Sequence, residues 1–368
     1  GGTERVVAYL TEGLLAQGHR VTVFASADSR TRARLIPCCP RALRLDPACR
    51  VPLAPQVRQL ELVARHAHEF DLIHFHIDLL HYPLARRLAA PSLTTLHGRL
   101  DLPELVPLCR EFADVPVVSI SDAQRAPLPW LPWLGTVYHG LPPDAYRLHE
   151  APGGYLAFLG RICPEKRPDR AIEIARRAGR PLWIAAKVDP ADQAYYAERI
   201  RPLLQEPGVE FLGEIGEAEK AAFLGNAAAL LFPIDWPEPF GLAMIEAMAC
   251  GTPVIAFRCG SVPEIVEEGV SGFIVDSVAE AVTAVPRAAR LSRRRVRAAF
   301  ERRFTVPAMV ERYLGVYERL LLQAPASRDR REAATAGLLG DGDRRRPVGP
   351  APAPPGRAAT GEAASGAA

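Results

Sequence analysis

Long hydrophobic runs, paired cysteines and lysine are all scarce in this sequence. No stretch of about 20 uncharged apolar residues occurs, so we expect no membrane-spanning helix. No leader of basic, apolar and then small residues opens the sequence, so no signal peptide is expected either. None of the seven cysteines forms a Cys-x-x-Cys pair, which favours reduced cytosolic thiols over a disulfide frame or a zinc site.

The remaining composition is typical of a soluble globular protein. Of the 368 residues, 48% are hydrophobic and 24% are charged, which excludes disorder over the whole chain. The net charge of +3 is too small to predict a nucleic-acid partner. The length fits two domains, and we expect a cytoplasmic protein whose oligomeric state the sequence does not indicate.

Short apolar runs alternate with helical patterns through the first 150 residues. Buried strands are predicted at residues 21–25, 71–76, 92–96 and 115–120. Helices are predicted at residues 4–16, 56–68, 79–88 and 105–112. Strands that alternate with helices indicate βαβ units and a parallel sheet.

The same alternation restarts after a cluster of helix breakers at residues 151–154. Further strands are predicted at residues 155–159, 182–186, 209–212, 229–232, 253–257 and 272–275, and a helix at 168–177. We therefore expect two doubly wound α/β domains, spanning residues 1–150 and 151–305. Residues 323–368 are rich in Ala, Pro, Gly and Arg, which predicts a disordered tail.

The motif with the most specific spacing is Glu238-Pro-Phe-Gly-Leu-Ala-Met-Ile-Glu246. A helix is predicted from Leu242, and its first turn offers free backbone N–H groups and a positive dipole end, which suit a phosphate. Glu238 precedes this helix and Glu246 lies in its second turn. A ligand with a sugar, a diphosphate and a ribose would meet these features in order, although either glutamate alone is more often a solvated surface residue.

A second candidate site follows the strand expected at 155–159. Arg161 and Lys166 lie in the loop after it, at the edge where open α/β sheets bind ligands. Arg161 would bind a diphosphate through two parallel N–H groups, and Lys166 would bind it as a point charge. The alternative is a basic loop exposed to water. The sequence holds only three lysines among its 45 basic residues, and one of them falls here. We favour the functional interpretation.

Three further motifs carry weaker signals. Gly2 opens the helix at 4–16 and could cradle an anion. His97 ends the strand at 92–96 and is followed by Gly98, at the edge where the site of such a sheet lies. His74 and His76 share one face of a strand, but without an obvious third ligand we prefer packing to a metal site.

Taken together, these motifs resemble family 4 of the retaining glycosyltransferases. The resemblance rests on the glutamate motif with its flank Ala-Met-Ala-Cys-Gly-Thr-Pro-Val-Ile, on Arg161 to Lys166, on His139-Gly140 and on Gly260-Ser-Val-Pro-Glu264. It covers residues 1–322. It implies a GT-B fold, in which two facing Rossmann-like domains enclose the active site and a last helix, expected at 306–322, crosses back to the N-terminal domain.

The resemblance also implies a role for each site residue. Glu238 contacts the sugar hydroxyls beside the reacting carbon, and His97 lines the sugar and acceptor pocket; these are the expected catalytic residues. The other seven would bind the donor through its diphosphate, its ribose or their own backbone N–H groups. These residues are Gly2, Arg161, Lys166, Phe240, Gly241, Leu242 and Glu246.

The implied chemistry needs no cofactor and no metal. Cations and a helix N-terminus stabilise the departing diphosphate, and the leaving phosphate takes the proton of the acceptor hydroxyl. The one Asp-x-Asp sequence, at Asp341 and Asp343, falls in the expected tail and we regard it as chance. The family's first strand would precede Gly1, so we expect a fragment whose neighbouring strand edges are exposed.

The donor and acceptor are less closely defined. A hexose linked to UDP, in the manner of UDP-glucose, is the preferred donor, and the acceptor is a glycan, a lipid or a small polyol. Peripheral contact with the inner face of a membrane is also considered. The alternatives are a nucleotide-sugar epimerase on the same fold and a non-catalytic GT-B fragment. A dinucleotide-dependent oxidoreductase is less favoured, because no Gly-x-Gly-x-x-Gly follows a strand.

Overall fold

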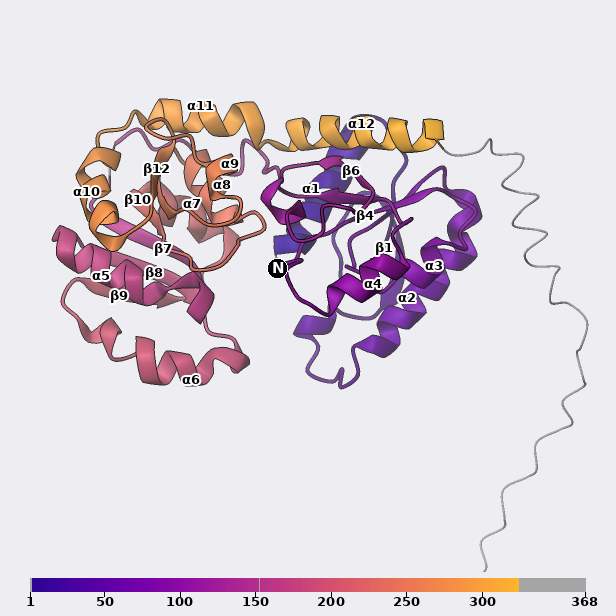
Figure 1. Ribbon diagram of the computed structural model, residues 1–368, viewed down its shortest axis with the longest axis horizontal. Coiled ribbons are helices and arrows are strands. Elements are labelled where there is room, and N and C mark those ends of the chain that lie inside the picture. The colour runs from indigo at the N-terminus through magenta and orange to yellow at the C-terminus, as the bar shows by residue number, and fades with distance from the viewer. Residues whose placement is uncertain (1, 152, 324–368) are drawn as a thin grey trace, which may run out of the picture.

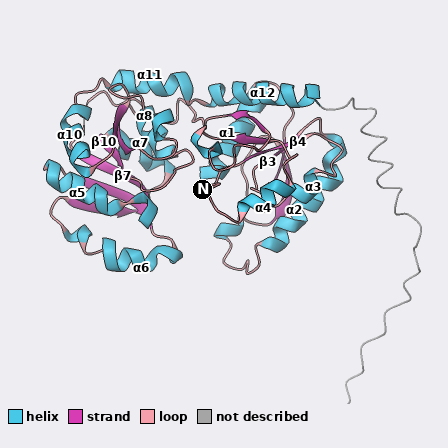
Figure 2. Cartoon of the chain, in the orientation of Figure 1, coloured by secondary structure: helices cyan, strands magenta, loops and turns pink. Residues whose placement is uncertain are grey.

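The computed structural model describes residues 2–151 and 153–323, which form two lobes that lie side by side (Figure 1). Each lobe holds parallel strands with helices packed around them (Figure 2). Two long helices, α11 (Arg293–Arg303) and α12 (Val306–Gln323), run end to end along one side of both lobes. This α/β architecture is the fold that the sequence predicts.

The N-terminal lobe contains its strands in two separate parallel sheets. The smaller pairs β1 (Thr22–Ser26) with β2 (Arg34–Cys39). The larger has the order β3-β4-β5-β6, and its strands are Ile73–Phe75, Ser92–Thr95, Val117–Ser119 and Trp133–Thr136. The four expected strands are confirmed, whereas β2 and β6 were not predicted. The missed strands contain Pro37 and Gly135, residue types that are uncommon inside strands.

The helices of this lobe are α1 (Gly2–Ala16), α2 (Leu53–His66), α3 (Tyr82–Ala85) and α4 (Leu105–Glu111). Short 3-10 turns at Leu43–Leu45, Ala67–Glu69 and Ala123–Arg125 complete the connections. The helix expected at 79–88 is much shorter than predicted, because only its middle four residues are α-helical. The strand expected before Gly1 lies outside the sequence and stays a prediction.

The C-terminal lobe is built on one parallel sheet with the order β12-β11-β10-β7-β8-β9. Its strands are β7 (Tyr155–Arg161), β8 (Leu182–Lys187), β9 (Val209–Gly213), β10 (Ala227–Phe232), β11 (Val254–Phe257) and β12 (Gly272–Val275). All six were predicted. The order reverses between β7 and β10, and a doubly wound sheet binds ligands at such a switch point.

Helices cover both faces of this sheet. On one face α5 (Pro168–Ala178) packs beside α10 (Val278–Ala288), and on the other α8 (Leu242–Ala249) packs beside α7 (Glu217–Gly225) and α11. The remaining helical pieces are α6 (Gln193–Tyr195), α9 (Val262–Ile265), a π-helical turn at Tyr196–Ile200 and 3-10 turns at Pro164–Lys166, Pro190–Asp192 and Leu203–Gln205. Two apolar layers result, one on each side of the strands.

Two chain crossings join the lobes, and they are hydrogen-bonded to each other. Leu141 N donates to Phe304 O at 2.8 Å, and Val306 N donates to Leu141 O at 3.0 Å. Gly140 lies so close to the returning chain that a Cβ there would stand 2.3 Å from the Thr305 carbonyl oxygen. The proposed domain division at residue 151 lies between the first crossing, at Leu141, and the start of β7 at Tyr155.

Helix α12 returns to the N-terminal lobe, as expected. Its apolar face packs on α1 and the larger sheet, with Val6 and Leu10 of α1 in the shared core. The helix includes Gln323, one residue beyond the predicted end, and the tail from residue 324 onward, with Asp341 and Asp343, lies outside the described residues. Within the described ranges, no helix is both long and apolar enough to cross a membrane.

Candidate active site

The loops after β7 and β10 meet at the switch point of the C-terminal sheet. The β10 loop leads through Gly241, whose φ of +81° is one that other residues rarely adopt, into the first turn of α8. Arg161, expected in the loop, is the last residue of β7, and Lys166 lies in the loop that follows at the same edge. The predicted helix start at Leu242 is therefore confirmed, and the two predicted basic residues lie beside the switch point.

Glu238 and Lys166 form an ion pair across these two loops. Glu238 is only 8% exposed, and the indole Nε1 of Trp236 also donates to its Oε2 at 2.9 Å. The Lys166 ammonium lies 5.4 Å from the Phe232 ring centre and 5.2 Å from that of Trp236. A carboxylate this buried is tolerated because it has both a cation and a hydrogen-bond donor.

Glu246 is buried more deeply and is bonded to the opposite lobe. It is 2% exposed, and its Oε1 accepts from Arg5 Nη2 of α1 at 2.6 Å and from the Tyr146 hydroxyl at 3.1 Å. Lys220 Nζ lies 3.6 Å from the same oxygen, and Arg5 also bonds Glu217 at 2.5 Å. Burial alone would lower the pKa of Arg5, but the two carboxylates raise it above its usual value, so this guanidinium stays charged.

Arg161 belongs to a different charged group. Its guanidinium lies 3.4 Å from Asp189, which also pairs with Lys187 at 2.6 Å. Arg161 and Lys187 are register partners on β7 and β8, so their side chains leave the sheet together. No hydrogen bond or ion pair joins Arg161 to Glu238 or Glu246 among the described residues, so the charged side chains of the region form three groups, around Glu238, Glu246 and Asp189.

His97 lies in a cluster of uncharged histidines at the ends of β3 and β4. His76 Nδ1 and His97 Nε2 are 2.9 Å apart, and the His97 ring stacks 5.3 Å from His139. Burial lowers the pKa of His97 to about 4, and burial with the neighbouring imidazoles holds the pKa of His76 well below its usual value. Nδ1 of His97 is buried without a hydrogen-bond partner. The site therefore presents a neutral imidazole near pH 7.

His74 and His76 share one face, as the sequence predicts, with ring centres 4.0 Å apart. His74 is bonded to Tyr317 of α12 and to Thr95, each at 2.8 Å, so it serves packing and hydrogen bonding. In residues 2–151 and 153–323, no group of three or more His, Cys, Asp or Glu side chains has the geometry to hold a metal ion.

Contacts between the lobes surround this region. A Cβ on Gly2 would stand 3.0 Å from Leu242, so the start of α1 faces the start of α8, as expected for Gly2. Phe240 is buried and packs edge-on against His139, with ring centres 4.7 Å apart. Glu264 also bonds the opposite lobe, because its two carboxylate oxygens accept from the backbone N–H groups of Asp122 and Ala123, each at 2.7 Å.

Several residues of this region were missed by the sequence reasoning. Arg5 is the most important, because it bonds a glutamate 241 positions away. The only local signal for Arg5 was its position one turn after Gly2, where α1 begins. Trp236 and Tyr146 carry no motif, and Glu264 belonged to a quoted motif without a role being expected for it.

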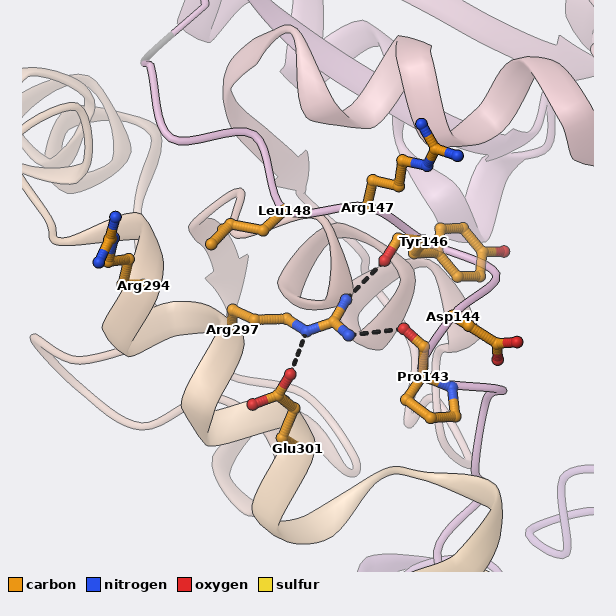
Figure 3. A pocket seen from close by; sticks show the side chains of 8 residues that line it. All are labelled: Pro143, Asp144, Tyr146, Arg147, Leu148, Arg294, Arg297 and Glu301. Carbon is orange, nitrogen blue, oxygen red and sulfur yellow. Dashed lines mark hydrogen bonds and ion pairs between the residues drawn. The ribbon is translucent and has the colours of Figure 1, made fainter.

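A cavity of about 640 Å³ lies beside the chain crossing, and Tyr146, whose hydroxyl bonds Glu246, is one of the residues that line it (Figure 3). Arg297 of α11 dominates it and donates to the carbonyl oxygens of Pro143 and Tyr146 and to Glu301. These bonds tie the crossing to α11. None of the nine predicted site residues lines this cavity, so we assign it a structural role.

Two family models match the chain, one on each lobe. The model described as Glycosyl transferases group 1 matches residues 149–298, and the one described as Glycosyltransferase Family 4 matches residues 1–134. The D-inositol 3-phosphate glycosyltransferase of Mycobacterium leprae is 33% identical over 127 residues, which are 33% of this chain and 29% of that protein. The match thus spans under a third of that relative's length.

Solved structures resemble the whole described chain. AviGT4, a glycosyltransferase involved in avilamycin A biosynthesis, is 26% identical with a TM-score of 0.64 over 87% of this chain and 90% of its own. Sucrose-phosphate synthase from Thermosynechococcus elongatus is 20% identical with a TM-score of 0.71, over 88% and 94%. HepE from Anabaena, solved with UDP, is 21% identical with a TM-score of 0.67, over 87% and 96%. These likenesses confirm the two-lobed fold.

The bond between Arg5 and Glu246 predicts an unequal effect of two arginine substitutions. Arg5→Ala leaves a buried carboxylate without its closest cation, so we expect the free energy of unfolding to fall by about 2 kcal/mol or more. Arg32→Ala is the matched control, because Arg32 pairs with Glu12 at 2.5 Å on an exposed surface. That change should cost less than about 1 kcal/mol. Equal shifts of the urea unfolding midpoint would contradict the assignment.

The buried histidines predict a loss of stability in mild acid. His81 is fully buried, bonds Thr94 at 2.6 Å and has its pKa lowered by burial to about 3. Because the unfolded chain takes up this proton near pH 6.5 and the folded chain does not, stability falls as the pH drops below 6.5. At pH 5 this histidine alone should account for about 2 kcal/mol.

His81→Asn removes this titration, so its melting temperature should fall less steeply between pH 7 and pH 5 than that of the parent protein. The slope is compared, because the substitution also changes packing at every pH. If the melting temperatures of the two proteins fall by the same amount between pH 7 and pH 5, the prediction is wrong.

Proposed function

Because the chain belongs to family 4 of the group 1 glycosyltransferases, we propose that it transfers a hexose from a nucleoside diphosphate sugar to an acceptor hydroxyl. The anomeric configuration of the donor is retained, and no divalent metal takes part. The donor is a UDP-linked hexose such as UDP-glucose. HepE, whose fold this chain shares, was solved with UDP and with UDP-glucose. The acceptor is a glycan, a lipid or a small polyol.

One observation carries this proposal. Lys166 and Glu238 are paired at the switch point, beside the N-terminus of α8. A phosphate there would meet the Lys166 ammonium and the N–H groups of the first turn of α8, near Phe240, Gly241 and Leu242. A sugar attached to that phosphate would lie within reach of Glu238. This is the order of groups in a nucleotide sugar.

The charge of the departing diphosphate is balanced by cationic side chains from all three groups. Lys166 acts from the group around Glu238, and Arg161 and Lys187 act from the β7–β8 edge, where Asp189 holds them together. Arg5 and Gly2 approach from the opposite lobe. Because these groups are positioned by ion pairs before the reaction, they stabilise the leaving group without a cation that arrives with the substrate.

The two glutamates have separate roles in this scheme. Glu238 accepts hydrogen bonds from the sugar hydroxyls and steadies the positive charge that develops at the reacting carbon. Glu246 accepts from the ribose hydroxyls. In the structure the cationic partners Arg5 and Lys220 approach Glu246 at Oε1, and we assign Oε2 to a ribose hydroxyl.

The acceptor hydroxyl attacks the face of the sugar that the diphosphate leaves, and the leaving phosphate takes its proton. His97 is a neutral imidazole near pH 7, so it orients the sugar and acceptor by hydrogen bonding and carries no charge of its own.

We also propose a cytoplasmic location with peripheral membrane contact.

The proposal predicts different kinetic effects for the two glutamates. Glu238→Gln should lower kcat by about 100-fold, because it removes charge that acts in the transition state. Glu246→Gln should weaken UDP binding by about tenfold with a smaller effect on kcat, because it removes a hydrogen bond made before and during the reaction. Turnover is followed by release of the matching nucleoside diphosphate from a panel of UDP-, GDP- and ADP-hexoses, and UDP binding is measured by calorimetry.

Glu173→Gln serves as the control, because Glu173 pairs with Arg177 on the exposed surface of α5 and should leave both parameters unchanged. The same kinetic signature in both site variants would contradict the division of roles. Epimerised donor without transfer would replace the proposal by the epimerase alternative.

A further inference from the structure

Exposed apolar side chains are concentrated in one segment of the N-terminal lobe. Leu45, Val51, Leu53 and Val57 are 63%, 62%, 54% and 54% exposed, and they fall within thirteen consecutive residues. Apart from Leu322 at the end of α12, they are the most exposed large apolar residues that the structure describes. Water contact with such side chains is unfavourable, so a surface of this kind commonly has a binding partner.

Two of these side chains continue the core face of α2. Leu60, Val63 and Ala67 lie on one stripe of the helix, and Val63 and Ala67 are buried against β1 and β3. Leu53 and Val57 extend the same stripe toward the N-terminus, where the described residues do not cover it. The first turns of α2 therefore present an apolar face to the surroundings.

The same segment is basic. Residues 41–58 include Arg41, Arg44, Arg50 and Arg58 but only one acidic residue, Asp46, so they carry four positive charges against one negative. All four arginines are exposed. Arginine can keep its charged head in water or at phosphates while its stem covers apolar surface. Apolar side chains interleaved with arginines are typical of helices that lie in the interface of an anionic bilayer.

This segment lies near the start of α1, which faces the start of α8 in the other lobe. Glu4 of α1 is near enough to Arg44 for its pKa to be influenced by that charge, and near enough to His97 to affect the imidazole. In Figure 1, α2 lies at the end of the N-terminal lobe that is remote from α12. A surface bound here would leave the α11–α12 side free.

We propose that residues 41–58 form a docking surface for an anionic lipid bilayer. Leu45, Val51, Leu53 and Val57 enter the interface, and Arg41, Arg44 and Arg50 contact lipid phosphates. The charge of the segment favours a lipid surface over a second copy of this chain, because two such surfaces would repel each other. The proposal gives the membrane contact in the proposed function a location, and its test needs neither donor nor acceptor.

The test is co-sedimentation of the full chain with vesicles. One set contains phosphatidylcholine alone, and the other contains about 30% phosphatidylglycerol, since anionic lipid should attract the arginines. We expect binding to the anionic vesicles at least about tenfold tighter than to the neutral ones, and weaker binding as salt is raised. Equal binding to both sets, or binding to neither, would overturn the proposal.

Variants separate the apolar and the charged contributions. Leu53→Ser with Val57→Ser, and Arg44→Ser with Arg50→Ser, should each weaken binding by about tenfold or more. The controls are Leu322→Ser, on the far side of the molecule, and Arg180→Ser with Arg201→Ser, which remove the same charge from the C-terminal lobe. These should bind as the parent protein does.

Two results would show that the surface has another role. An equal loss of binding in the controls would mean that net charge or general stickiness governs binding, and would overturn the proposal. A rise in sedimentation mass with protein concentration that Leu53→Ser and Val57→Ser abolish would assign the surface to a second copy. UDP binding, measured on the same variants, should be unchanged and reports separately on the proposed function.

Discussion

The structure depends on how two buried carboxylates are neutralised. Glu238 and Glu246 are almost fully removed from water, which is unfavourable for a charge unless a cation and hydrogen-bond donors stand beside it. Glu238 finds Lys166 within its own lobe, whereas Glu246 takes Arg5 from the opposite lobe. The charges that we propose bind a nucleotide sugar therefore also connect the lobes. Folding and the proposed chemistry share these groups.

Sheet topology brings these charges to one place. The reversal of strand order between β7 and β10 places two loops at the same edge, and the hydrogen-bonded crossing at Leu141 and Thr305 sets the N-terminal lobe over them. The α12 helix fixes that arrangement by packing on α1, whose first turn carries Gly2 and Arg5. The first turn of α1 thus contacts the proposed donor site only when the two lobes are joined in this way.

Sequence reasoning predicted what is local and missed what crosses the chain. The α8 start at Leu242 and the loop after β7 follow from glycine positions and from the carboxyl ends of strands, so both could be predicted. The bond from Arg5 to Glu246 spans 241 positions and leaves no local pattern. The separation of Arg161 from the glutamates is set by its register with Lys187, which depends on strand pairing rather than on spacing. The shortened α3 begins beside Pro83, because proline is tolerated only in the first turn of a helix.

The central claim is retaining transfer without a metal, and hydrolysis of UDP-glucose by the full chain tests it without a known acceptor. Glucose released in excess chelator is read by proton NMR at its anomeric signal before mutarotation. We expect α-glucose to form first, with UDP, because water would attack the face that the diphosphate leaves. First formation of β-glucose would contradict retention. Release that stops in chelator and returns with Mg²⁺ would contradict metal independence.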